Sequence, residues 1–327
     1  MAPNKTSRRV WQYETTPRTS ALQNAADIAF DFGEYDDSIL KWNVGAIENR
    51  ILQSFVYNKR TPTLVDGRRK FNTFHEIFNP TTAQWLVWIL GKCTDAGTDT
   101  IEPLDTGYQH PLTIRHEEGG GTETFEQAVS CWCVSAYCRA AAKEPIVVDL
   151  EFAFEQYQDH DDEPQLTSTI RSAGYTDTVG AYNGMPTVTY DPDSAATIIP
   201  QIVKAEFKIV QNYSATLNGS DTAQTIYKRT YEPVDLTLQA IMEVNTYWDE
   251  FMDRGTQDWE VAVYKPDPTY NIKMKFVNCK HMKTVKAGEA FKGFYTSTIH
   301  LQAEEVTATF VRDGSTTWAD HFLGEVV

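Results

Sequence analysis

The chain has 327 residues, which is enough for one large or two moderate domains with buried cores. Its 45 acidic and 29 basic side chains give a net charge of −16, which argues against a protein that grips nucleic acid through its phosphates. The hydrophobic content of 41% is that of a globular protein, and the aromatic share of 12% favours sheet over helix.

Residues 1–39 are polar and mixed, and they predict an extended N-terminal arm with one short helix near "SALQNAADIAF". They contain no apolar stretch of signal-peptide length, and the longest apolar run, "WLVWIL" at 85–90, is too short to cross a bilayer. We therefore expect neither secretion nor membrane insertion. Five cysteines, an odd number, favour free thiols over a disulfide framework.

Residues 40–158 are predicted to form a first β domain. After a strand, a turn-rich loop and a further strand, "NPTTAQWLVWILGK" (79–92) has the pattern of a helix. Asn79 is its expected N-cap, Pro80 its first helical residue and Gly91 its end.

Two long alternating segments follow in this domain, "TFEQAVSCWCVSAYC" and "IVVDLEFAFEQY" (146–157), with the turn "AAAKEP" between them. From Phe125 to Tyr157 they predict a hairpin with roughly fifteen residues on each strand, which is longer than ordinary strands. Such a hairpin exposes a long edge that has to be paired, covered or charged.

Residues 159–200 are rich in Thr, Ser, Gly, Asp and Pro, and they predict a linker or inserted loop with at most short strands. Residues 201–312 are predicted to form a second β domain, with a short helix at "NTYWDEFMDRG" (245–255). Its second long hairpin consists of "IKMKFVNCKHMKTVK" and "FYTSTIHLQAEE". Residues 313–327 remain as a C-terminal tail.

The two β domains repeat one order of elements, which predicts an internal duplication. "AVSCWC" (128–133) parallels "FVNCKH" (276–281), and "NKRTPTLVDG" (58–67) parallels "YKRTYEPVDL" (227–236). The two helix segments also correspond.

The cysteine-rich stretch "SCWCVSAYC" raises the question of a metal site. On a regular strand Cys131 and Cys133 point to one face and Cys138 to the other. With Cys279 and His281 the first two would make a zinc-like set, but ligands two residues apart on a strand are not the usual zinc spacing. We expect small buried hydrophobic residues instead, and no catalytic, cofactor-binding or metal-binding residues.

The two hairpin units, "FEQAVSCWCVSAYCRAAAKEPIVVDLEFAFEQ" (125–156) and "IKMKFVNCKHMKTVKAGEAFKGFYTSTIHLQAEE" (272–305), resemble the tail tube proteins, or major tail proteins, of long-tailed phages and archaeal viruses. "VVDLEF" matches the family's strand pattern closely and "TSTIHL" matches it loosely. The resemblance covers residues 40–157 and 202–312.

The resemblance implies a mainly β fold: two tandem tail-tube-like sandwich or barrel domains, each with a flanking short helix and a long hairpin that lines a tube. It implies a non-enzymatic virion protein, made in the host cytoplasm, whose stacked rings form the DNA conduit of a long non-contractile tail. Two units per chain imply trimeric rings with pseudo-six-fold symmetry, with hexameric rings as the alternative. The implied partners are further copies of the chain, the tape measure protein, passing DNA, and the tail terminator and distal tail proteins.

The acidic balance suits a channel that must not bind DNA, and Asp149, Glu151 and Glu155 alternate with apolar residues so that they share one strand face. Two other classes stay open. One is a β-sandwich binding module or baseplate component that binds carbohydrate or protein. The other is a metal-dependent enzyme on a β scaffold, with ligands from the cysteines and from "DHDDE" (159–163).

Overall fold

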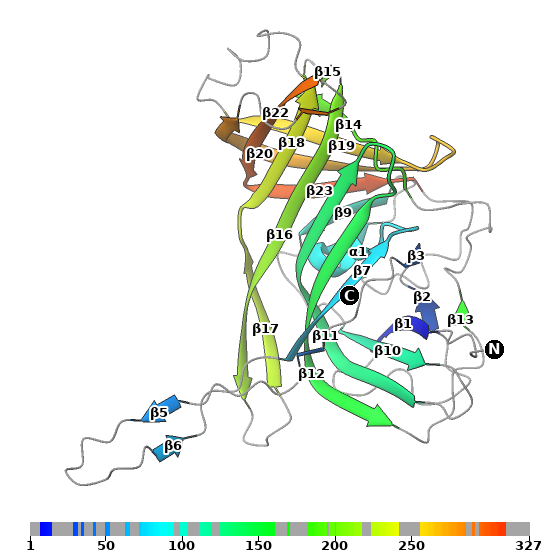
Figure 1. Cartoon of the computed structure of the whole chain (residues 1–327), viewed down its shortest axis with the longest axis vertical. Coiled ribbons are helices and arrows are strands. Elements are labelled where there is room, and N and C mark those ends of the chain that lie inside the picture. The colour runs from blue at the N-terminus through cyan, green and yellow to red at the C-terminus, as the bar shows by residue number, and fades with distance from the viewer. Residues whose placement is uncertain are drawn as a thin grey trace.

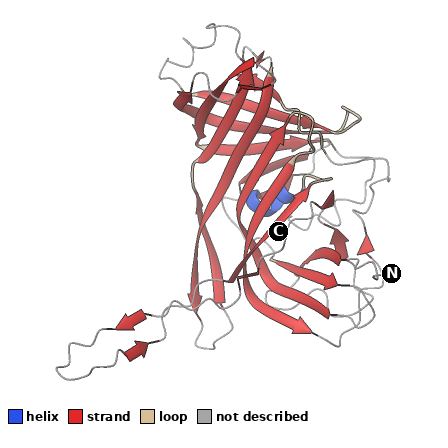
Figure 2. Cartoon of the chain, in the orientation of Figure 1, coloured by secondary structure: helices blue, strands red, loops and turns tan. Residues whose placement is uncertain are grey.

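The computed structural model describes residues 7–14, 29–31, 34–35, 42–43, 50–52, 63–65, 72–94, 99–103, 111–118, 124–160, 169–170, 182–194, 196–199, 201–217, 224–241, 256–285, 290–291 and 294–311. In these ranges the chain forms long antiparallel strands and a single helix (Figures 1 and 2). The expected mainly β class is therefore confirmed.

A wide sheet of seven antiparallel strands runs through both halves of the chain. Its strands, in spatial order, are β7 (Asn72–Asn79), β12 (Val147–His160), β11 (Thr124–Ala141), β16 (Ile202–Leu217), β18 (Val234–Ile241), β22 (Phe294–Ala303) and β20 (Asn271–Val285). Two short strands, β3 (Glu34–Tyr35) and β4 (Trp42–Asn43), pair with the outer edge of β7. The middle of this sheet is the pairing of β11 with β16, where the two halves of the chain meet.

Two smaller sheets share their long strands with the wide sheet. In the first half, β1 (Ser7–Tyr13) pairs with β10 (Leu112–Glu118), which pairs with the first part of β11. In the second half, β14 (Thr187–Tyr190) pairs with β19 (Gln257–Tyr264), which pairs with the first part of β20. On its other side this part of β20 pairs with β23, and the sheet continues through β9 to β8; their bounds are Glu305–Phe310, Asp99–Pro103 and Gly91–Thr94.

The remaining strands are short or peripheral. They are β2 (Ala29–Asp31), β5 (Arg50–Leu52), β6 (Thr63–Val65), β13 (Thr169–Ile170), β15 (Thr197–Ile199), β17 (Gln224–Tyr231) and β21 (Ala290–Phe291). β17 pairs with the far end of β16 and makes a long hairpin that leaves the body beside β11 and β12 (Figure 1). Among the described strands, β5 and β6 pair only with each other, and they lie away from the other labelled strands (Figure 1).

The helix α1 (Gln84–Leu90) lies in the middle of the core, and all seven of its residues are buried. Trp88 packs edge-on against Trp11 of β1 and Phe152 of β12, with ring centroids 4.9 and 6.0 Å apart. Trp85 stacks on Phe207 of β16 at 6.2 Å. One buried cluster therefore joins the N-terminal strand, the first hairpin and the second half of the chain.

The helix starts later than its sequence pattern predicts. β7 runs up to Asn79, whose side-chain amide donates to the carbonyl of Ile146 at 2.8 Å, so this residue anchors a strand instead of capping the helix. Ala83 occupies the N-cap position and has no side-chain cap. The end at Gly91 is confirmed: its φ of 102° is left-handed, which suits glycine, and its N–H donates to Val87 O.

The first long hairpin is confirmed, because β11 and β12 pair from Phe125–His160 to Arg139–Val147. The second is divided: β20 pairs with β22 only over 280–285, and its first part pairs with β23. The helix predicted at 245–255 lies outside the described residues. Among those that are described, no helix is long and apolar enough to span a lipid bilayer.

Candidate assembly edges

β11 carries a β-bulge where it leaves the smaller sheet for the wide one. Ser130 has a φ of 55°, and the pairing with β10 slips at this point. A non-glycine residue accepts this left-handed conformation when its surroundings fix it. Here Glu14, 1% exposed, accepts the Ser130 N–H at 2.6 Å, the Ser130 hydroxyl at 2.9 Å and the Thr113 hydroxyl at 2.9 Å.

β20 carries the same bulge in the second half. Asn278 has a φ of 52°, and the pairing with β19 slips there in the same way. Its N–H donates to Asp258 Oδ1 at 2.8 Å, and its side-chain amide donates to Glu304 Oε2 at 3.0 Å. Ser130 and Asn278 are the third residues of the two matched segments, so the sequence parallel marks a shared backbone feature. Both residues have small polar side chains, and Asn in particular tolerates the left-handed conformation. These residue types are the sequence feature from which the bulge could have been predicted.

A second bulge follows four residues later in each strand. The pairing of β11 with β12 slips at Val134, and the pairing of β20 with β22 slips at Met282. Equal spacing of two irregularities fixes the equivalence of the strands residue by residue, because a bulge shifts every later side chain to the other face. Val134 therefore corresponds to Met282, and the residues that follow correspond in turn.

The second bulge also corrects the cysteine orientation expected for a regular strand. Cys138 does not point away from Cys131 and Cys133; all three belong to the same buried cluster, since the extra residue at Val134 restores their common face. Cys279 is buried in that cluster as well. Burial raises the pKa of the Cys131 and Cys138 thiols, and it raises the pKa of Cys279 to about 12.

The described residues contain no group of three or more His, Cys, Asp or Glu side chains that could hold a metal ion. Cys279 Sγ donates to the carbonyl of Phe276 at 3.4 Å, and Cys133 Sγ donates to that of Ser135 at 3.6 Å. These thiols serve as buried packing groups with weak hydrogen bonds.

The joint between the halves is the antiparallel pairing of β11 with β16, from Ser135–Val210 to Ala141–Lys204. Across it the Tyr137 hydroxyl donates to Glu206 Oε1 at 2.5 Å. Burial and then this hydrogen bond raise the pKa of Tyr137, so the hydroxyl keeps its proton. The joint thus combines a backbone ladder with a side-chain contact between the halves.

The corresponding edge of β20 is open. Over 280–285 β20 pairs with β22 on one side, and no described strand pairs with its other side. The opposite end of the wide sheet is also open, since β4 pairs only with β7 within the described part. Lys280, Met282 and Lys283 are exposed on the open strand, and lysines on an edge discourage indiscriminate strand pairing.

The face of the wide sheet that points away from the core carries both signs of charge. Its charged side chains that are at least partly exposed are Asp149, Glu151, Glu206 and Asp235 on the acidic side, and Arg139, Lys204, Lys208, Lys280 and Lys283 on the basic side. Glu155 falls on this face by alternation but is 4% exposed. Asp149, Glu151 and Glu155 thus share one strand face, as their alternation predicts, but the described part of this face as a whole has no acidic excess.

Each of the four partly exposed carboxylates on this face lies within hydrogen-bond distance of a side chain on a neighbouring strand. The pairs are His75 with Asp149 at 2.9 Å, Ser135 with Glu151 at 3.2 Å, Tyr137 with Glu206 at 2.5 Å and Gln302 with Asp235 at 3.2 Å. Such cross-strand contacts stabilise strand register. These carboxylates are thus engaged within the sheet.

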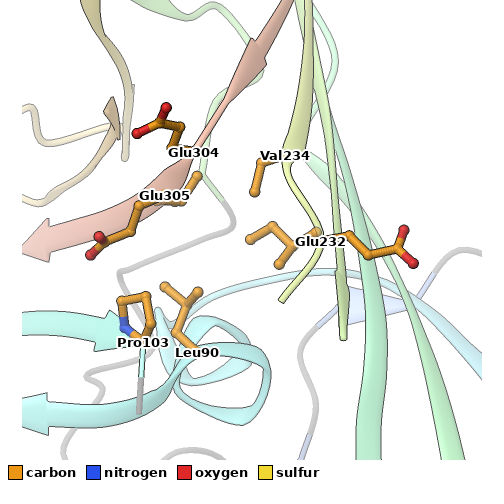
Figure 3. Close-up of a pocket in the computed structure, with 8 residues that line it drawn as sticks. Leu90, Pro103, Glu232, Val234, Glu304 and Glu305 are labelled. Atoms are coloured by element: carbon orange, nitrogen blue, oxygen red, sulfur yellow. The ribbon is translucent and has the colours of Figure 1, made fainter. Parts of the chain in front are cut away.

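A cavity of about 230 Å³ lies at the junction of the two halves. Leu90, Pro103 and Val234 line it, while the carboxyl groups of Glu232 and Glu304 point away from Leu90 (Figure 3). Three of its eight lining residues are glutamates, Glu232, Glu304 and Glu305, and their carboxyl groups point in different directions (Figure 3). A hollow without convergent polar groups does not have the make-up of a catalytic or cofactor site.

No family model matches the chain, and no curated protein matches it significantly.

Proposed function

We propose that this protein is the structural subunit of a viral tail tube, which assembles head to tail into stacked rings around a hollow channel. The observation that carries the proposal is the repeated edge: β16 covers β11, whereas no described strand covers the matching edge of β20. Repetition of that joint between copies is a heterologous contact, which gives closed rings if the rotation closes.

The proposal includes an internal duplication of one structural unit. In the first half the pairing runs β1–β10–β11–β12–β7. In the second half it runs β14–β19–β20, and β20 then pairs with both β22 and β23, which together take the place of β12. β18 pairs with β22 and takes the place of β7. In each unit a further strand lies beside β7 or β18, namely β4 or β16. Three copies would form six units of four strands, and six copies would form a ring twice as large.

The stagger between the two units supports closure into a barrel. A row of directly paired residues runs across five neighbouring strands, from β18 to β7. In order, these residues are Leu236, Phe207, Cys138, Val148 and Phe78. By the matched bulges, however, the counterpart of Leu236 is Phe74, four residues before Phe78.

The register therefore shifts by four residues for every four strands. The shear number of a closed ring would then equal its number of strands. Eight-stranded barrels of shear 8 have the same ratio and a strand tilt of about 36°. Closed barrels have tilts of about 35–45°, so this register suits a ring of any number of units.

In the proposed tube the outward face of the wide sheet lines the channel, and its mixed charge would let DNA pass without binding. Its basic side chains are interspersed with hydrogen-bonded carboxylates, so it offers no continuous basic strip that would hold phosphates. In the virion we expect the tape measure protein and then DNA to occupy the channel. The tail terminator and distal tail proteins would close its ends.

Electron microscopy of the purified protein in negative stain tests the function, across a range of concentration and salt. We expect rings and tubes with a stain-filled centre. Monomers that persist under every condition, or solid aggregates without a channel, contradict the proposal.

A further inference from the structure

We propose that the open edge of β20 binds the β4 edge of a second copy, in antiparallel register, with Val285 opposite Asn43. This pairing rests on the proposed assembly and names its contact. The occupant is a second copy because the chain already covers the equivalent edge with its own equivalent strand.

The register follows from the joint inside the chain. There Tyr137 of β11 pairs with Lys208 of β16. Tyr137 lies three residues after the bulge at Val134, so its counterpart on β20 is Val285, three residues after Met282.

The counterpart of Lys208 follows from its pairing with β18. Lys208 pairs with Asp235, the residue before Leu236. In the first unit, the residue before Phe74 is Thr73, and Thr73 pairs with Asn43. Asn43 is therefore the residue that repetition of the joint places opposite Val285.

A difference in exposure between matched side chains indicates the same surface. Val134 is 4% exposed and packs with Ala153 and Trp132, whereas its counterpart Met282 is 60% exposed. The counterpart of Ala153 is Gln302, which is partly exposed. One unit thus has its flank covered inside the chain, and the other presents the same flank to solvent.

The covering elements also have counterparts. Beside the first unit run the end of β16 and β17, which form a hairpin next to β12 (Figure 1). In chain order, the hairpin of β5 and β6 takes this place ahead of β7, and it pairs with no other described strand. We infer that it lies over Met282 of the neighbouring copy when β4 joins β20.

Engineered disulfides test this contact. Residues directly opposite in an antiparallel pair have Cα atoms about 4.5–5.5 Å apart, which suits a disulfide. The test variant carries Val285→Cys with Asn43→Cys. Tyr137→Cys with Lys208→Cys is the matched intrachain control. Lys280→Cys with Asn43→Cys lies five residues out of register and is the register control. Each single variant controls for pairing between identical cysteines.

On mild oxidation we expect the test variant to form a ladder of covalent oligomers on a non-reducing gel, ending at the number of copies in the ring. The intrachain control should stay monomeric and run faster. If the intrachain control oxidises but the test variant stays monomeric, the pairing is overturned. It is also overturned if Val285→Cys alone forms dimers as efficiently, because that indicates a symmetric β20–β20 contact.

The outcomes separate this inference from the proposed function. A ladder without any hollow tube supports the edge pairing and contradicts the tail tube. Hollow tubes of the test variant without a ladder support the tube and contradict the pairing.

Discussion

β11 and β20 have matching backbone irregularities but lie in different settings. Both have a left-handed residue, a second bulge four residues on and at least one buried cysteine on the core face. β11 is paired on both sides along its second part, whereas among the described strands β20 is paired there on one side only. Since the same backbone features occur in β20 without a second described neighbour, these bulges do not depend on the pairing with β16. The pairing with β16 adds cover to a strand that already has this shape.

The largest expected effect is on the covered side of this comparison. Val134→Asp places a carboxylate at a site that is 4% exposed, beside Trp132 and Ala153. Burial of an unpaired charge is costly, so we expect the free energy of unfolding to fall by about 3 kcal/mol or more. Urea unfolding followed by fluorescence measures this loss.

Met282→Asp is the matched change on the open side. Met282 is 60% exposed, so we expect the free energy of unfolding of the monomer to change by less than about 0.5 kcal/mol. Assembly should nevertheless stop, because the carboxylate would be buried under the neighbouring copy. Urea unfolding measures the stability of the monomer, and sedimentation velocity measures assembly. A variant that assembles like the native protein would show that Met282 stays exposed in the ring.

The next comparison is between Glu14 and Asp258, whose carboxylates accept the backbone N–H groups of the two left-handed residues, Ser130 and Asn278. Glu14→Ala removes the acceptor of three hydrogen bonds and leaves the Ser130 N–H buried without that partner. We expect a loss of about 1–3 kcal/mol in the free energy of unfolding. An unchanged urea midpoint would mean that the N-terminal strand does not fix this bulge.

Asp258→Ala should have a smaller effect. The Asp258 side chain is 22% exposed, so water can replace its hydrogen bond to the Asn278 N–H. We expect a loss of about 1 kcal/mol or less, measured in the same urea titration. A loss equal to that of Glu14→Ala would show that burial does not distinguish the two sites.

The thiols should give the weakest response. Burial holds the pKa of Cys131, Cys138 and Cys279 above its usual range, so little thiolate is present at neutral pH. We expect these cysteines in the native protein to react with iodoacetamide far more slowly than in urea, whereas Cys93 is partly exposed and should react first. Peptide mass mapping measures this order, and rapid labelling of Cys131 or Cys279 would contradict their burial.

Much of the fold could be predicted from local pattern. Alternation of apolar and polar residues predicted the first long hairpin, and the end of the helix at Gly91 was predicted from the glycine itself. The parallel between "AVSCWC" and "FVNCKH" located the matched bulges without revealing that they are bulges. The common face of Cys131 and Cys138 was missed, because the apolar residues Trp132 and Val134 on either side of Cys133 hide the change of phase that the bulge introduces.

The later start of the helix and the joint could not be predicted for a different reason. Asn79 is a good capping residue in isolation, but its bond to Ile146 depends on a strand that follows almost seventy residues later. The pairing of β11 with β16 likewise joins segments separated by the stretch expected to be a linker, of which residues 187–190 form β14. Long-range pairings of this kind are set by tertiary packing.

Hydrogen exchange with peptide-level mass spectrometry, on monomers and on the assembled protein, tests the central claim most directly. The amides of 135–141 lie on a strand paired on both sides, so they should be protected in both states. The amides of 280–285 should exchange partly in the monomer and become protected in the assembly. Assembled rings in which 280–285 exchange as fast as in the monomer would contradict the account.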